Sequence, residues 1–142
     1  MIILGTNVIS ELMLARPQPA VLGWLNGLAL SELATTTISV AEVRYGLARL
    51  PPGRRRSDLD TRFRAFAARA FANRVFDFDR IAAEVYGELV AARERSGRPL
   101  EGFDGLIAAI AKSRSLPLAT RNLADFAGCG IALISPWQDA GD

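Results

Sequence analysis

The chain contains no histidine, and it has only one cysteine and one lysine among its 142 residues. The missing imidazole excludes catalytic triads with a histidine base, histidine-ligated zinc and histidine general bases. The lone Cys129 can form no disulfide within the chain, which predicts a structural thiol in a reducing compartment. Long apolar runs are also missing, and none reaches the roughly 20 residues that a membrane span needs. Catalysis by this chain therefore has to use carboxylates, hydroxyls or arginines.

The amino terminus does not resemble a signal peptide, because no positive charge precedes its apolar stretch and Glu11 interrupts that stretch. We therefore expect a cytoplasmic protein without a membrane segment. The net charge is only +2, but Lys112 is the sole lysine, so the positive charge is almost entirely arginine. Arginine makes bidentate contacts with phosphate and so favours a nucleic-acid partner. A genome rich in arginine codons explains the same composition equally well.

The hydrophobic pattern alternates between short apolar runs and longer amphipathic segments, as in an α/β protein. Asp79 is placed to cap one helix, Thr6 or Asn7 another, and Ser39 and Glu42 have the spacing of a capping box. Right-handed crossovers then give one domain over residues 1–142, with a five-stranded parallel sheet and helices on both faces. The predicted strands cover residues 1–4, 33–37, 75–78, 118–120 and 131–134, and the helices cover about 6–14, 17–28, 39–50, 57–71, 80–95, 103–115 and 123–126.

Three acids, Glu42, Asp104 and Asp125, fall near the start of predicted helices, and Gly5 occupies the place where a fourth acid is expected. Each acid has an ordinary explanation: Glu42 as the capping partner of Ser39, Asp104 at a helix dipole, and Asp125 as a loop acid. Those separate explanations do not account for their joint placement at the carboxyl edge of a parallel sheet, where ligands bind.

Carboxylates about 5 Å apart repel by about 3 kcal/mol per pair at an effective dielectric near 20, and a divalent cation relieves this repulsion. Mg²⁺ or Mn²⁺ held by hard oxygen ligands can activate water against a phosphodiester. The polar residues Thr6, Asn7, Thr120 and Asn122 would orient the ligands through hydrogen bonds. The sequence thus predicts a metal site with one corner missing.

Five segments, in order, carry a resemblance to a known family. They are Ile3-Leu-Gly-Thr-Asn-Val-Ile-Ser-Glu11, Thr37-Ile-Ser-Val-Ala-Glu-Val-Arg-Tyr-Gly46, Phe103-Asp-Gly-Leu-Ile-Ala-Ala-Ile-Ala111, Ala119-Thr-Arg-Asn122 and Ser135-Pro-Trp137. The chain resembles the PIN-domain ribonucleases, and more narrowly the FitB-like branch of the VapC toxins of type II toxin–antitoxin modules. The resemblance implies a five-stranded parallel sheet and Mg²⁺-dependent cleavage of RNA, often tRNA or ribosomal RNA. It also implies inhibition by a VapB-like antitoxin, a homodimer and a toxin–antitoxin hetero-oligomer.

By the same resemblance, Glu42 and Asp104 match metal-site acids of the family. Some relatives place the last acid at Asn122 and others use the position of Asp125, and we favour Asp125 with Asn122 as a polar neighbour. The family has aspartate where this chain has Gly5, so this form is expected to be weakened or inactive. Either the glycine is natural, or it arose so that a toxic enzyme could be produced, and we favour the second.

The main alternative is a catalytically silent PIN-like protein that binds RNA or an antitoxin. A phosphoacceptor receiver domain is disfavoured, because it needs paired acids after its first strand and a lysine near its last. Two further surfaces follow as weaker hypotheses. The arginines Arg54, Arg55 and Arg56 would guide RNA, although a solvated charge cluster explains them equally well. An apolar groove for an antitoxin helix would involve Trp24, Tyr45 and Leu47.

Overall fold

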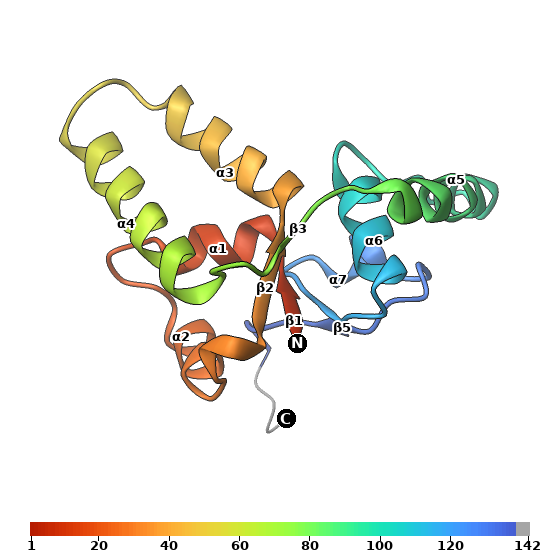
Figure 1. The fold of residues 1–142 in the computed structure, drawn as a ribbon, viewed down its shortest axis with the longest axis horizontal. Coiled ribbons are helices and arrows are strands. Elements are labelled where there is room, and N and C mark those ends of the chain that lie inside the picture. Colours follow the sequence, from red (N-terminus) through yellow and green to blue (C-terminus); the bar gives the residue numbers. More distant parts are fainter. Residues whose placement is uncertain (139–142) are drawn as a thin grey trace.

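The computed structural model describes residues 1–138, and the last four residues of the predicted 1–142 domain lie outside the described part. The described chain forms the expected five-stranded sheet, in the order β3-β2-β1-β4-β5, with every neighbouring pair parallel (Figure 1). The strands are short and cover β1 (Ile2–Leu4), β2 (Leu33–Thr36), β3 (Val75–Phe76), β4 (Leu118–Ala119) and β5 (Leu133–Ile134).

The central strand, β1, carries the register of the sheet, because Ile3 is paired with Ala34 of β2 and with Leu118 of β4. From β1 the chain moves outward to β2 and β3, and it then returns to the other side of β1 for β4 and β5. The strand order therefore reverses between β1 and β4. In open parallel sheets this reversal leaves a crevice beyond the carboxyl ends of the two strands.

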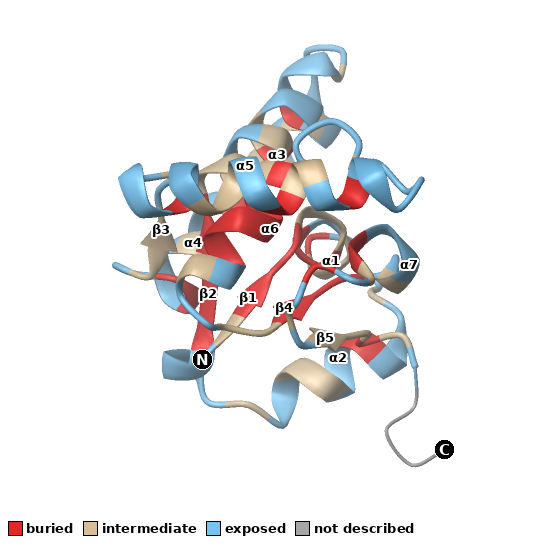
Figure 2. Ribbon diagram, turned by 90° about the vertical axis from the view of Figure 1, so that its right-hand side faces the viewer, coloured by how far each residue is buried: buried red, intermediate tan, exposed pale blue. Residues whose placement is uncertain are grey.

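Side chains alternate between the two faces of β1, so that neighbouring residues enter different hydrophobic clusters. Ile3 packs into the cluster formed with α5, α6 and α7, whereas Leu4 packs into the cluster formed with α1, α3 and α4. Figure 1 shows these two groups of helices on opposite sides of the strands, and Figure 2 shows buried residues along β1, β4 and α6. The helices are α1 (Thr6–Leu12), α2 (Pro19–Asn26), α3 (Thr37–Arg49), α4 (Arg54–Ala70), α5 (Arg80–Arg95), α6 (Asp104–Ser113) and α7 (Leu123–Phe126), with a 3-10 turn, η1 (Leu30–Glu32), before β2.

Two helix starts differ from the prediction in a way that matters for the site. The cap of α3 is Thr36, whose Oγ1 accepts a hydrogen bond from the Ser39 backbone N at 3.0 Å. The predicted capping box of Ser39 and Glu42 is therefore wrong, and Glu42 lies in the second turn of the helix, free for another role. At α1 the cap position is Gly5, which has no side chain to offer, so the predicted capping by Thr6 or Asn7 is also wrong.

Other boundaries follow the sequence more closely. Asp79 caps α5 as predicted, since its Oδ1 accepts a hydrogen bond from the Ala82 backbone N at 2.9 Å. The basic helix α4 begins at Arg54, three residues earlier than predicted, so the three consecutive arginines form its first turn and do not precede it. Among the described residues, no helix is long and apolar enough to cross a membrane.

Candidate metal centre

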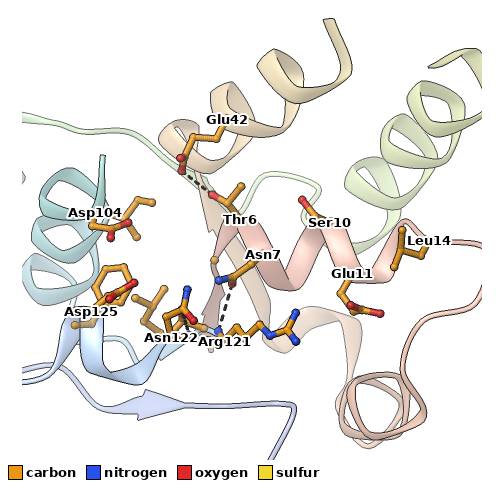
Figure 3. Close-up of a pocket in the computed structure, with 15 residues that line it drawn as sticks. Thr6, Asn7, Ser10, Glu11, Leu14, Glu42, Asp104, Arg121, Asn122 and Asp125 are labelled. Atoms are coloured by element: carbon orange, nitrogen blue, oxygen red, sulfur yellow. Dashed lines mark hydrogen bonds between the residues drawn. The ribbon is translucent and has the colours of Figure 1, made fainter. Parts of the chain in front are cut away.

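A cavity of about 480 Å³ opens at the point where the strand order reverses, beyond the carboxyl ends of β1 and β4 (Figure 3). The residues directly after β1 and those directly after β4 form its floor, and acids from four different helices line it. The residues relevant to the prediction that line it are Gly5, Thr6, Asn7, Glu42, Asp104, Thr120, Asn122 and Asp125. The fold thus brings to one cavity all the acids and neighbouring polar residues that the sequence singled out.

The side chain of Glu42 is held in position by Thr6, the first residue of α1. Its Oε1 accepts a hydrogen bond from Thr6 Oγ1 at 2.7 Å, and the same hydroxyl lies 3.1 Å from Ser39 Oγ (Figure 3). The acid is half-buried, so this short contact restricts its carboxylate to the side of the cavity that faces α1. Thr6 therefore orients Glu42, as the prediction of an orienting neighbour requires.

Asp104 is the first residue of α6 and is half-buried at the cavity wall. Burial raises the pKa of this carboxyl to about 6, with further contributions from the negative charges of Asp125, Glu42 and Glu101, while Arg93 acts in the opposite direction. The three predicted acids thus share one electrostatic environment, in which an ionised Asp104 is costly without a cation.

Asp125 belongs to the four-residue helix α7, and buried Arg93 of α5 fixes its main chain. Arg93 Nη1 donates to the carbonyl oxygens of Asp125 at 3.1 Å and Ala127 at 2.9 Å, and Arg98 Nη2 donates to that of Ala124 at 3.1 Å. We did not predict the role of Arg93. The sequence offers no signal for it, since an arginine in the last turn of a helix is usually solvated.

Gly5 has an ordinary extended backbone, with φ −75° and ψ 169°, which any residue can adopt. Its N donates to the carbonyl oxygen of Ala119 at 2.9 Å, so β4 lies close beside it. A Cβ added at Gly5 would stand 3.0 Å from that oxygen. A side chain here is therefore compatible with the backbone conformation but requires β4 to give way by a few tenths of an ångström.

The chemistry of the donors suits Mg²⁺ or Mn²⁺, because all three acids provide hard oxygen ligands. The arrangement is nevertheless open: within residues 1–138, no three acid or cysteine side chains form a group ready to hold a metal ion. Mg²⁺ commonly keeps several waters and needs only one or two carboxylates, so the donor set fits this ion in kind. The acids thus do not close around an ion, which agrees with the absence of a side chain at Gly5.

The remaining predicted neighbours make local hydrogen bonds at the cavity floor. Asn7 Oδ1 accepts from the Arg121 backbone N at 3.3 Å, and Thr120 Oγ1 accepts from the Asn122 backbone N at 3.3 Å. The first contact connects the turn after β4 to the start of α1, and the second lies within that turn. Arg121, which lies in the segment from Ala119 to Asn122, also lines the cavity, and no role was predicted for it.

Two weaker predictions concern residues outside this cavity. The arginines at the start of α4 do not line the cavity with the acids, and Arg56 borders a second cavity between α3 and α4, so their role in guiding RNA stays a prediction. Of the residues predicted for an antitoxin groove, Leu47 is only 5% exposed and belongs to the core cluster against which half-buried Trp24 packs, whereas Tyr45 is exposed. The groove itself stays a prediction.

Comparison with known proteins agrees with this architecture. The PIN-domain family model, described as "PIN domain", matches residues 2–127. VapC ribonuclease Y4jK from Sinorhizobium fredii is 41% identical over 99% of this chain and 100% of its own length, and Toxin FitB from Neisseria gonorrhoeae is 37% identical over 98% and 100%. The solved structure of FitAcB from Neisseria gonorrhoeae has a TM-score of 0.90 at 36% identity, covering 98% of this chain and 100% of the other. This chain therefore belongs to the PIN-domain family, in the branch of the VapC ribonucleases and the FitB toxin.

Proposed function

We propose that this chain is the toxin of a type II toxin–antitoxin module and that its activity is Mg²⁺-dependent endonucleolytic cleavage of RNA, with tRNA or ribosomal RNA as the substrate. The observation that carries the proposal is the gathering of Glu42, Asp104 and Asp125 from three helices around one cavity at the reversal point of the sheet. The names of the relatives, a VapC ribonuclease and a FitB toxin, support the same conclusion.

In this proposal Asp104, Glu42 and Asp125 hold the metal ion, with Mn²⁺ as a possible substitute for Mg²⁺. The ion would supply Lewis acidity at the phosphate and a water nucleophile at neutral pH. The chain's own residues then have separate tasks. Thr6 orients Glu42, Arg93 fixes the main chain that carries Asp125, and Asp104 has to be ionised to bind the ion.

Gly5 leaves this form impaired, because the position contributes no carboxylate to the cavity. The loss of one group that stabilises charge at the reacting centre costs a few kcal/mol, so we expect cleavage at least about a hundredfold slower than with aspartate at this position. The extended backbone of Gly5 supports this proposal, since nothing in its conformation demands glycine.

The partners follow from the same family relationship. We propose a VapB-like antitoxin as the inhibitor, a homodimer and a toxin–antitoxin hetero-oligomer as the assemblies, and cytoplasmic RNA as the target. The FitAcB and FitAB structures among the relatives support an antitoxin partner.

The test compares cleavage of a total-tRNA pool by the Gly5 protein and its Gly5→Asp and Gly5→Ala variants, with Mg²⁺ and with chelator. Gly5→Ala is the matched control, because it brings the same Cβ toward the Ala119 oxygen without a carboxylate. We expect Mg²⁺-dependent cutting by Gly5→Asp and at least about a hundredfold less by the other two. Equal rates for all three proteins would contradict the proposed impairment.

Within residues 1–138, the acids do not form a group of three ready to hold a metal ion. This observation favours one second candidate, a catalytically silent protein that binds RNA or an antitoxin. The same assay separates the two. If folded Gly5→Asp protein cuts no RNA in Mg²⁺ but still binds it, the silent binding role replaces the ribonuclease.

A further inference from the structure

Within residues 1–138, Arg121 is the only cation among the residues that line the acidic cavity. Four carboxylates, those of Glu11, Glu42, Asp104 and Asp125, share the lining with it. A polyanion that approaches such a surface is repelled, even where a divalent ion neutralises two of the charges. An anionic strand therefore needs a cationic contact at the cavity besides the metal, and the lining offers one.

The structure holds Arg121 in place without pairing its charge with an acid in residues 1–138. It is the second residue after β4, and its backbone N donates to Asn7 Oδ1 at 3.3 Å. Its guanidinium carbon lies 5.1 Å from the centre of the Trp137 ring, a distance at which cation and ring attract each other. Figure 3 shows its side chain running along the edge of the cavity toward Glu11, with Asp104 and Asp125 at the other end.

Several other arginines have their guanidinium groups bonded within the fold, whereas the Arg121 guanidinium is available. Arg44 and Arg64 both pair with Asp60, and the buried guanidinium of Arg93 donates to main-chain carbonyls. Arg121 is exposed, and it forms no salt bridge with any acid in residues 1–138. A guanidinium stacked on one face keeps its edge N–H groups free, in the fork geometry that fits a phosphate.

We propose that Arg121 is the phosphate anchor of this cavity: it binds a phosphodiester of a single-stranded RNA segment next to the one held by the acidic centre. The inference rests on the proposed ribonuclease function and adds to it a site for a neighbouring phosphate. RNA would then contact the turn after β4, whereas the sequence predicted a contact at the start of α4.

The test measures binding of a 5′-fluorescein-labelled oligouridine by fluorescence anisotropy, in Mg²⁺ and at several salt concentrations, with intact RNA verified on a gel. The proteins are the Gly5 chain and its Arg121→Gln, Arg121→Lys and Arg95→Gln variants. Arg95→Gln is the matched control, because it removes an exposed arginine at the end of α5, outside the cavity. Thermal melting checks that all four proteins are folded.

We expect Arg121→Gln to weaken binding by about tenfold or more and to lower the slope of log affinity against log salt by about 0.7, the value for one phosphate of a single strand. Arg121→Lys should recover part of the affinity, since it keeps the charge but loses the fork, and Arg95→Gln should bind nearly as the parent does. If Arg121→Gln and Arg95→Gln bind alike while the parent binds RNA, the anchor is wrong and the ribonuclease proposal stands. If the parent binds no RNA under any of these conditions, the anchor and the proposed function both fail.

Discussion

At the scale of single residues, Asp104 is the acid with the most strongly altered environment. Its pKa is raised to about 6, chiefly by burial and next by the charges of Asp125 and Glu42. A carboxyl whose pKa is higher in the folded than in the unfolded chain holds its proton more tightly when folded, so stability falls as pH rises from about 4 to about 6. Above this range the ionised carboxylate lowers the stability of the folded chain, and a bound cation would offset this loss.

This leads to a prediction for Asp104→Asn, which removes the charge and keeps the shape. At pH 7.5 without metal, we expect the variant to melt about 2–4 °C higher than the parent, for a gain of about 1 kcal/mol after solvent screening. At pH 4.5 the difference should nearly vanish, because the parent carboxyl is then protonated. Calorimetric melting at the two pH values measures this.

The control for that experiment is Asp58→Asn, which removes an exposed carboxylate on α4, outside the cavity. It should change the melting temperature little at either pH. An Asp104→Asn variant that is less stable than the parent at pH 7.5 would show that the carboxylate is held by favourable contacts and not strained by its neighbours.

At the scale of elements, Arg93 joins the end of α5 to the segment that carries Asp125. Besides its bonds to the Asp125 and Ala127 carbonyls, its Nε donates to the Arg98 carbonyl at 2.6 Å and its Nη1 contacts Cys129 Sγ at 3.2 Å. No carboxylate pairs with this buried guanidinium among residues 1–138, so main-chain acceptors carry its stabilisation. The short helix α7 thus takes its position from α5.

We therefore expect Arg93→Met to lower the free energy of unfolding by about 2–4 kcal/mol, because it leaves several carbonyls without their donor. Arg95→Met, two residues along the same helix but exposed, should change it by no more than about 0.5 kcal/mol. Urea unfolding of the two variants provides the measurement. If the two variants are equally stable, the contacts of Arg93 make no net contribution to the free energy of unfolding.

The sequence predicted the elements better than the contacts between them. The five-stranded parallel sheet and the helices on both of its faces followed from the alternation of apolar runs and amphipathic segments, whereas the strand order was not predicted. Local capping was misread at Glu42, since a spacing pattern cannot show that Thr36 supplies the cap and that Thr6 approaches from a distant helix. The role of Arg93 could not be predicted for the same reason: the Asp125 and Ala127 carbonyls that it binds lie more than 30 residues away.

At the scale of the whole molecule, the acids meet because of the path of the chain. The sheet reverses its order between β1 and β4, and the turns after these two strands carry Gly5 and Arg121. The amino-terminal ends of helices from both faces lie beside this crevice, α3 from one face of the sheet and α6 from the other. The joint placement of the three acids was predictable from this topology, whereas the degree to which they close around an ion was not.

The acidic cavity is, in our proposal, a metal centre with one ligand missing. The most direct test of this centre measures Mn²⁺ binding by titration calorimetry at pH 7.5 and compares the Gly5 protein with its Gly5→Ala and Gly5→Asp variants. We expect Gly5→Asp to bind the ion at least about tenfold more tightly than the other two, because only this variant adds a carboxylate to the cavity. The same affinity for all three proteins would contradict the metal centre, since the position of Gly5 would then contribute nothing to it.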